Sequence, residues 1–222
     1  ALDSNGSITG DTLIVPANAD FNATIGTISF WLRCAGMVGP GSEAMIWDRR
    51  SGSTTGQGAA ITLREDGLLS FQAADGTDVR CQFNSTISVM DDRWHHVAFV
   101  FNQTAGASVS CYIDGVASGA GINQSPSWSW NASQQIEIGR SHDPTWRKFE
   151  GDLDDIRFYS AALSGSEIAL LANNEADSVA SPSLSLNLQP AMQGVNTSAY
   201  LRIPFDVANP QAFTSLNLKL RW

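Results

Sequence analysis

The sequence lacks the features of three classes of protein. No apolar run approaches the roughly 20 residues that span a membrane, so membrane insertion is not expected. Lysine is scarce, the net charge is −9, and the nearest approach to a basic cluster is the pair Arg49-Arg50. A chain of this charge repels phosphate backbones, which argues against nucleic acid as a partner. No Cys-x-x-Cys spacing occurs, so zinc and redox chemistry are not expected.

Cysteine is also rare. The chain has 3 cysteines, Cys34, Cys81 and Cys111, so at least one of them has no partner within the chain. Each lies in an alternation of apolar and polar residues, which predicts that all are small buried core residues. A single disulfide between two of them is the alternative.

What the sequence does contain, up to about residue 160, is alternation of apolar and polar residues. This period of two is typical of strands with one buried face. Asp-Gly pairs at 66–67, 75–76 and 114–115 favour tight hairpins. The fold class predicted is therefore all-β, a two-sheet antiparallel β-sandwich. Strands are expected near 11–16, 27–34, 43–48, 58–64, 68–74, 78–83, 94–101, 108–113, 135–139 and 152–159.

One short helix is expected near 164–173. Ser164 and Glu167 form the pattern of a capping box in front of an apolar run. Beyond it the composition turns to Ser, Pro, Asn and Gln, and alternation returns only near the end of the chain. We therefore predict a sandwich domain over 1–175, a linker over 176–198, and the opening strands of a truncated second β domain over 199–222.

Three segments carry a resemblance to a known family. They are WHHVAFVFN (Trp94–Asn102), CYIDGVASG (Cys111–Gly119) and GDLDDIRFYSAALSGSEIALL (Gly151–Leu171). In order and spacing these resemble the laminin-G-like and pentraxin-like domains, which are concanavalin A-like jelly rolls. The segment 199–222 resembles the opening of a galactose-binding-like β domain. Both resemblances imply a multidomain protein that is secreted or on the cell surface, with the neighbouring β domain as a partner.

The resemblance also implies a structural calcium ion. Asp154 matches the Asp of the family's closing strand, which often ligates calcium, and backbone oxygens near Asp3 would complete the site. The alternative is an Asp whose carboxylate is capped by backbone N–H groups. Asp155 and Arg157, two residues apart, are expected to form a surface pair.

The chain has 7 tryptophans, and three of them suggest a ligand site. Trp128, Trp130 and Trp146 lie in polar, Pro-containing segments, where exposed indoles would stack on pyranose rings beside polar groups such as Asp143. Alternatively, these segments fold back as a lid or pack against a neighbouring domain. Trp31 and Trp94 lie on predicted strands and are expected to be wholly or partly core.

Catalysis has little support. His95 and His96 are adjacent on a strand and point to opposite faces, so they cannot share one metal ion. Glu150, Asp152 and Asp154 share a face, but the carboxylate pattern of the laminarinase-type β-glucanases ends in Glu and lies on an interior strand.

The sequence therefore predicts a non-catalytic, calcium-stabilised carbohydrate-binding or adhesion module, with a glycan or an extracellular or surface protein as its partner. A structural or protein-interaction repeat is the alternative, and a glycoside hydrolase of the β-glucanase type is the third reading.

Overall fold

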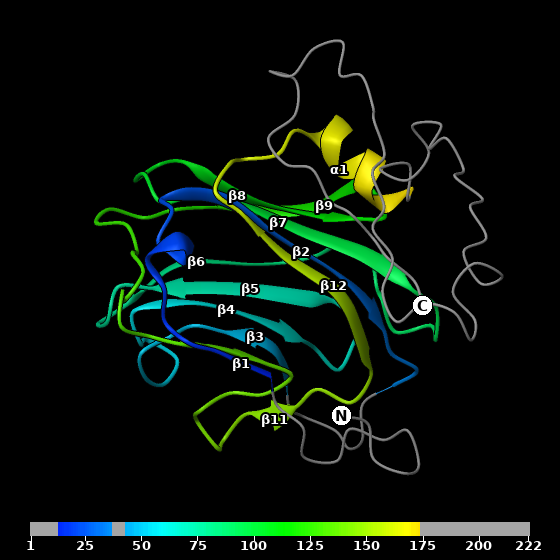
Figure 1. The fold of residues 1–222 in the computed structure, drawn as a ribbon, viewed down its shortest axis with the longest axis horizontal. Helices are drawn as coiled ribbons and strands as arrows, with labels where there is room; N and C mark the ends of the chain where they lie inside the picture. The colour runs from blue at the N-terminus through cyan, green and yellow to red at the C-terminus, as the bar shows by residue number, and fades with distance from the viewer. Residues whose placement is uncertain (1–12, 37–42, 174–222) are drawn as a thin grey trace, which may run out of the picture. The chain divides into compact units, whose positions relative to one another are not determined.

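The structure, a computed structural model, describes residues 13–36 and 43–173, which form two antiparallel sheets packed face to face (Figure 1). The predicted linker and second domain lie outside these residues. The strands are β1 (Leu13–Val15), β2 (Ile25–Arg33), β3 (Ala44–Asp48), β4 (Gly58–Leu63), β5 (Leu69–Ala74), β6 (Val79–Asn84), β7 (His95–Asn102), β8 (Ser108–Ile113), β9 (Val116–Ile122), β10 (Ile136–Ile138), β11 (Arg147–Lys148) and β12 (Asp152–Tyr159).

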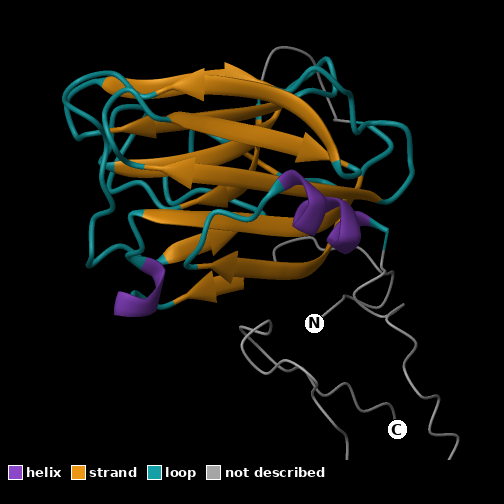
Figure 2. Cartoon of the chain, turned by 90° about the horizontal axis from the view of Figure 1, so that it is seen from above, coloured by secondary structure: helices purple, strands orange, loops and turns teal. Residues whose placement is uncertain are grey.

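A seven-stranded sheet has the order β1-β10-β3-β4-β5-β6, and β11 pairs with β3 in parallel as a seventh strand. A five-stranded sheet has the order β12-β2-β7-β8-β9. Seen from above, the strands of each sheet lie side by side (Figure 2). The helices of the described chain, η1 (Ala19–Phe21) and α1 (Gly165–Ala172), lie outside the two sheets. The all-β sandwich predicted from alternation is confirmed.

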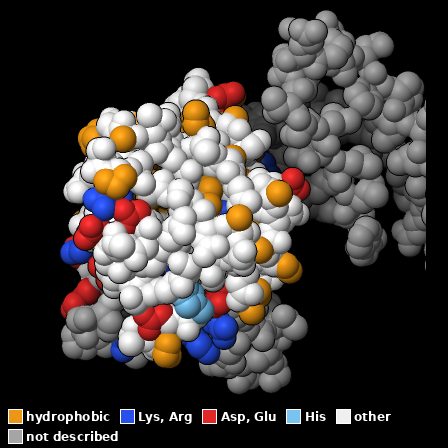
Figure 3. Space-filling model, turned by 90° about the vertical axis from the view of Figure 1, so that its left-hand side faces the viewer, with side chains coloured by type: hydrophobic (Ala, Val, Ile, Leu, Met, Phe, Trp, Pro, Cys, Tyr) orange, Lys and Arg blue, Asp and Glu red, His pale blue; other side chains and the backbone are white. Residues whose placement is uncertain are grey.

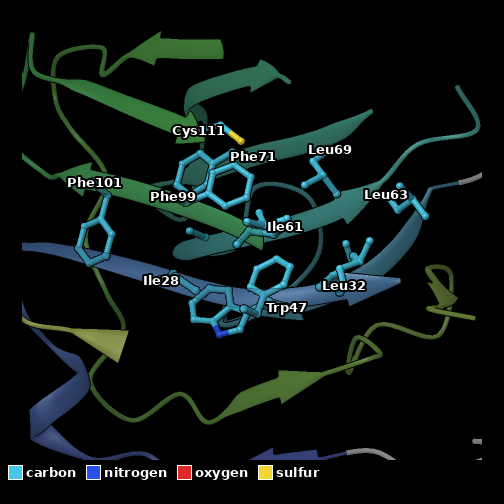
Figure 4. Close-up of a cluster of buried hydrophobic side chains, with 14 of the residues drawn as sticks. Ile28, Leu32, Trp47, Ile61, Leu63, Leu69, Phe71, Phe99, Phe101 and Cys111 are labelled. Carbon is cyan, nitrogen blue, oxygen red and sulfur yellow. The ribbon is translucent and has the colours of Figure 1, made fainter. Parts of the chain in front are cut away.

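The core lies between the two sheets and follows the alternation. On β2, Ile28, Phe30 and Leu32 point inward and are at most 1% exposed. From the opposite sheet Ile61 and Phe71 meet them, and Figure 4 shows these side chains interleaved between the layers. The three cysteines are buried and free, as predicted. Burial raises the pKa of the Cys81 thiol to about 12, so that thiol stays protonated and unreactive at neutral pH.

Small residues close one side of the sandwich, where β6 and β9 meet edge to edge. A Cβ at Gly119 would lie 2.5 Å from the carbonyl oxygen of Asn84, and one at Gly121 would lie 2.7 Å from the Phe83 ring. Only glycine allows this approach of the two backbones. Strand β9 was not expected from the sequence, because its Gly- and Ala-rich stretch has little apolar alternation.

Helix α1 covers part of the outer face of the five-stranded sheet (Figure 1). The predicted capping box is present, with Ser164 accepting from the Glu167 backbone N–H and Glu167 accepting from that of Ser164. Ile168 is fully buried beneath the helix. Gly115, in the β8–β9 turn with φ +77°, lets the helix come close, since a Cβ there would lie 2.9 Å from the Cα of Ala169.

The indoles of Trp128 and Trp130 close one end of the core, and the prediction that they are exposed is wrong. Trp128 is 1% and Trp130 is 8% exposed. The two rings meet edge to face with centroids 4.7 Å apart. Each indole N–H has an internal acceptor: Trp128 donates to Asn123 Oδ1 (3.0 Å) and Trp130 to the carbonyl of Ala23 (2.8 Å). Satisfied N–H groups allow both rings to enter the apolar interior.

Candidate functional site

A polar row crosses the outer face of the seven-stranded sheet. The strand register places Glu137, Asp48, Ala60, Gln72 and Gln82 side by side on β10, β3, β4, β5 and β6. Their neighbours in sequence face the core, so the pleat turns this row outward. Glu137 and Asp48 are nevertheless 1% and 0% exposed. Other side chains must therefore cover the middle of this face.

The first covering group is Arg50, which forms a buried ion pair with Asp48. Arg50 Nε donates to Asp48 Oδ1 (2.9 Å), Nη2 donates to Oδ2 (3.2 Å), and the backbone N–H of Arg50 also donates to Oδ1 (3.0 Å). Both side chains are 0% exposed. Two-point geometry with an added backbone bond is what offsets the cost of removing two charges from water.

Arg50 extends across the sheet and supports an indole. Its Nη1 donates to Gln72 Oε1 (3.3 Å) on β5, so the guanidinium lies above β4, where Ala60 is small enough to leave room. The ring centroid of Trp146 lies 5.0 Å from Arg50 Cζ. The indole thus rests on a buried cation and remains partly exposed.

The loop between β10 and β11 is tied to the same ion pair. Ser141 Oγ donates to Asp48 Oδ2 (2.5 Å) and accepts from the backbone N–H of Asp143 (3.0 Å). His142 Nε2 lies 3.1 Å from the Gly52 carbonyl oxygen. The loop that carries Trp146 is therefore fixed from both sides, and β11 continues it along β3.

Asp143 places a carboxylate in the same turn as Trp146. Its Oδ1 accepts from the Thr145 backbone N–H (3.0 Å) and from Thr145 Oγ1 (2.7 Å), and its carbonyl accepts from the Trp146 N–H (3.2 Å). These bonds, the backbone one first, hold the pKa of Asp143 below its usual range. Asp143 Oδ2 has no donor among the described residues, so one anionic oxygen beside the indole is free to accept hydrogen bonds.

His142 adds a second unused polar atom. Its Nδ1 is buried without a hydrogen-bond partner among the described residues and lies 3.7 Å from Asp48 Oδ2. The side chain is 28% exposed. Together Trp146, Asp143, His142 and Gln72 form what we call the strap site: an indole, a carboxylate, an imidazole and an amide on a rigid sheet.

The structure thus brings together two of the four residues predicted to bind a ligand. Trp146 and Asp143 lie in one turn, whereas Trp128 and Trp130 lie in the core and present no stacking surface. Sequence reasoning missed Asp48, Arg50 and His142. A signal was present, because Asp48 and Arg50 are two residues apart at the end of a predicted strand and so share a face.

The structure describes one of the two residues expected to hold calcium, Asp154. Asp154 is exposed, and its Oδ1 accepts from the backbone N–H of Asp155 (2.8 Å). In residues 13–36 and 43–173 no group of three or more His, Cys, Asp or Glu side chains could hold a metal ion. Asp3 lies outside these residues, so the calcium prediction remains a prediction. The expected surface pair is present, with Arg157 Nη2 2.6 Å from Asp155 Oδ2.

The three acidic residues considered for catalysis lie at the open edge of the five-stranded sheet. Asp152 pairs with Arg33, whose Nη2 is 2.7 Å from Asp152 Oδ2, and the two side chains are 41% and 44% exposed. Glu150 and Asp154 are exposed. An exposed edge with one carboxylate engaged by arginine differs from the paired, water-excluding arrangement of a glycosidase.

Surface charge is mixed rather than basic. On the face drawn in Figure 3, acidic and basic side chains lie intermingled around a largely uncharged centre. Arg49 and Arg50, the nearest approach to a basic cluster in the sequence, are both fully buried. Among the described residues no helix has the length and apolar character needed to cross a membrane.

The family follows from the sequence match. Residues 5–169, more than half of the chain, match the concanavalin A-like lectin/glucanases superfamily under its laminin-G-like profile. The chain belongs to this superfamily. The two-sheet sandwich with its single α-helix, described above, agrees with the resemblance seen in the three sequence segments. No curated protein matches the chain.

Solved structures share the fold at low identity. The binding domain of Paraclostridial Mosquitocidal Protein 1 is 20% identical over 76% of this chain and 42% of its own, with a TM-score of 0.62. The heptameric SAP-like pentraxin of Limulus polyphemus is 16% identical over 73% and 82%, with a TM-score of 0.52. Botulinum neurotoxin type C, whose cell entry depends on interaction with two ganglioside molecules, is 19% identical over 73% and 39%, with a TM-score of 0.55. The chain spans less than half of both toxin structures.

Proposed function

We propose that this domain is a non-catalytic carbohydrate-binding module of a larger secreted or cell-surface protein, and that it binds its ligand at the strap site. The observation that carries the proposal is the Trp146 indole, which is partly exposed and rests 5.0 Å from the guanidinium of the buried Arg50–Asp48 pair. An indole held in this way loses little freedom when a pyranose ring stacks on it.

The polar groups around the indole suit a sugar. Asp143 Oδ2 and the Gln72 side chain offer acceptors and donors for hydroxyl groups, and the carboxylate, whose pKa is lowered from its usual value, is ionised at neutral pH. The net charge of −9 favours an uncharged glycan over an anionic one. The superfamily includes lectins, and the toxin relatives that share the fold are binding domains, which supports binding rather than catalysis.

The direct test is Trp146→Ala in the full chain, measured on an array of neutral oligosaccharides and then by calorimetry on the best ligand. Half-burying an indole face removes about 60–100 Å² of apolar surface from water, so we expect the affinity to fall about ten- to seventyfold. Trp146→Phe should restore part of it. The control is Ile122→Ala, which removes an exposed apolar side chain on β9, outside the strap site.

Two outcomes would contradict the proposal. Unchanged affinity in a folded Trp146→Ala variant would remove the strap site from binding. If the wild-type chain bound no neutral glycan on the array, the proposed class of ligand would be wrong. Asp143→Ala gives an independent reading, because it removes the free carboxylate oxygen and should weaken binding severalfold.

Calcium enters the proposal as a stabiliser and not as a ligand of the sugar. Among the described residues the strap site has no cluster of metal-binding side chains, so binding through Trp146 should persist in excess chelator. If Asp154 anchors a weak extracellular site, millimolar calcium should instead raise the free energy of unfolding by about 1.5–2 kcal/mol. Asp154→Asn should abolish this increase. Identical melting curves with calcium and with chelator would contradict a stabilising calcium site.

A further inference from the structure

A second group of aromatic and charged side chains occupies the outer face of the five-stranded sheet. The register places Trp31 opposite His96 on β7 and opposite Asp154 on β12, and places Arg33 opposite Asp152. Trp94 immediately precedes β7 and lies next to Arg33. We call these residues the open-face block: Trp31, Arg33, Trp94, His96, Asp152 and Asp154.

The indoles of the open-face block are available to solvent. Trp94, expected to be wholly or partly core, is 43% exposed, and Trp31 is partly exposed. Helix α1 packs over β7, β8 and β9, toward the other side of the same face. Two indoles on one flat sheet, outside the helix, form an aromatic surface that packing within the sandwich does not require.

Ion pairing holds this surface in place. Arg33 Cζ lies 5.6 Å from the ring centroid of Trp94, and Arg33 Nε and Nη2 donate to Asp152 Oδ2 at 2.9 and 2.7 Å. The guanidinium therefore joins a carboxylate on β12 to an indole at the start of β7. Exposed pairs of this kind add little stability, so their value lies in fixing the position of the ring.

His96 provides the second observation that points to a ligand. The residue is 3% exposed, its ring meets Trp31 edge to face with centroids 5.4 Å apart, and its Nδ1 has no hydrogen-bond partner among the described residues. An unpartnered polar atom that is buried costs free energy. Asp154 adds a carboxylate whose only hydrogen bond within the described part of the chain is the one from the Asp155 N–H. The block thus holds polar groups whose hydrogen-bonding capacity the described residues do not use.

We propose that the open-face block is a second carbohydrate-binding surface, so that the domain holds an uncharged polysaccharide at two faces. The proposal takes its class of ligand from the proposed function and adds a site. Indoles flanked by Asp152, Asp154 and Arg33 match the stacking faces and polar groups that bind pyranose rings. The surrounding carboxylates, which include Asp155, disfavour an anionic glycan.

Two sites on opposite sheets change how the domain binds. A short oligosaccharide occupies either site with the affinity of that site alone. A polysaccharide cross-links domains, or is held by two sites at once, and gains apparent affinity from its high effective concentration. The two-site arrangement therefore predicts a stoichiometry of two for a short ligand and stronger retention of a long one.

The experiment uses the full chain and four variants: Trp146→Ala, Trp94→Ala, Trp31→Ala, and Ile122→Ala as the control on the same sheet. Retention is measured in affinity gels containing laminarin, mannan, xylan or dextran, and stoichiometry by calorimetry with hexasaccharides from the polysaccharide that binds. We expect two hexasaccharides per wild-type chain and one in each of Trp146→Ala and Trp94→Ala. Melting temperatures show that each variant is folded, and Trp31→Phe replaces Trp31→Ala if the latter unfolds.

The outcomes separate this inference from the proposed function. One bound hexasaccharide in Trp146→Ala and one in Trp94→Ala, against two in the wild type, supports the second surface. Loss of all binding in Trp146→Ala, with Trp94→Ala and Trp31→Ala at wild-type affinity, overturns the second surface and leaves the strap site. The reverse result overturns the strap site and keeps the open-face block. A block that binds only a lysine-rich peptide, and no polysaccharide, overturns the carbohydrate assignment in favour of a protein partner.

Discussion

Two segments of this chain look alike in sequence and end in opposite surroundings. SPSWSWNAS (Ser125–Ser133) and SHDPTWRKF (Ser141–Phe149) are both polar, both contain proline, and neither predicts a core. The first sends Trp128 and Trp130 into the interior, whereas the second lays Trp146 on an ion pair at the outer face of a sheet. The difference lies in the side chains that each indole contacts, and the polarity of the loop does not predict those contacts.

The buried indoles meet acceptors for their N–H groups and aromatic neighbours. Trp128 lies near Phe71 and Phe101, with ring centroids 6.1 and 5.9 Å away, and Trp130 lies 5.4 Å from Phe101. Arg49 closes the cluster, with Cζ 4.9 Å from the Trp130 ring. Asn123, which directly follows β9, supplies the acceptor that lets Trp128 be fully buried.

Replacing an indole in each segment should lower the free energy of unfolding by different amounts. Trp128→Ala leaves a large cavity in the core, and we expect it to lower the free energy of unfolding by about 3–5 kcal/mol. Trp146→Ala removes a partly exposed ring and should cost about 1–2 kcal/mol. Urea denaturation of both variants, with the slope checked for two-state behaviour, measures the difference. Equal losses would mean that Trp146 is as much a core residue as Trp128.

The ion pair beneath Trp146 offers a second way to separate the segments. Asp48→Asn leaves the Arg50 guanidinium buried without a counter-charge, so we expect the free energy of unfolding to fall by about 3 kcal/mol. Glycan affinity should fall too, because Ser141 and Arg50 lose their shared anchor. The double variant Asp48→Leu with Arg50→Met removes both charges and should recover much of the stability without recovering binding. Full recovery of binding would show that Trp146 needs no charged support.

Much of the fold could be predicted, because alternation and turn residues report on local structure. Ten predicted strands and the helix correspond to observed elements, with ends shifted by up to two residues. Strand β9 pairs with β8 across the Asp114-Gly115 turn, but its Gly- and Ala-rich stretch has little apolar alternation to show it. Strand β11 has only two residues, too few to show a period, and pairs in parallel with β3, a distant partner that a local pattern does not contain.

The candidate site was harder to predict for the same reason. Trp128 and Trp130 are two residues apart and their indoles meet in the core, but the spacing alone could not say whether they faced the core or solvent. Arg50 in sequence is one of two adjacent basic residues, and only the sheet shows that it crosses Ala60 to reach Gln72. Residue types suggested a ligand site, while the support beneath Trp146 comes from Asp48, Arg50 and Gln72, which lie far from Trp146 in sequence.

Trp31 provides a third case for comparison. Its indole meets the neutral imidazole of His96, whereas the indole of Trp146 lies on the guanidinium of Arg50. Burial lowers the pKa of His96 to about 4, against opposing effects of Asp114 and Asp155 and in concert with the positive charge of Arg157. His96 gains a positive charge in acid, so the surroundings of Trp31 should respond to acid.

The pH dependence of stability follows from the pKa of His96 in the unfolded and folded chain. Unfolded His96 takes up a proton below about pH 6.5 and folded His96 does so only near pH 4, so the free energy of unfolding falls as pH drops from 6.5 to 4. The lowered pKa corresponds to about 2–3 kcal/mol, and His96→Gln should remove this part of the acid destabilisation.

The pKa of His95, one residue earlier, shifts in the opposite direction. Burial tends to lower its pKa, but the carboxylates of Asp114 and Asp91, 2.7 and 2.9 Å from its ring nitrogens, raise it. His95 therefore contributes stability that is present below pH 6.5 and lost as pH rises through its folded pKa, and His95→Gln should make the protein more sensitive to acid. Denaturation from pH 4 to 8, compared among wild type and the two variants, measures both. Parallel curves for the two variants would show that the adjacent imidazoles share one environment, and would contradict an acid response specific to the surroundings of Trp31.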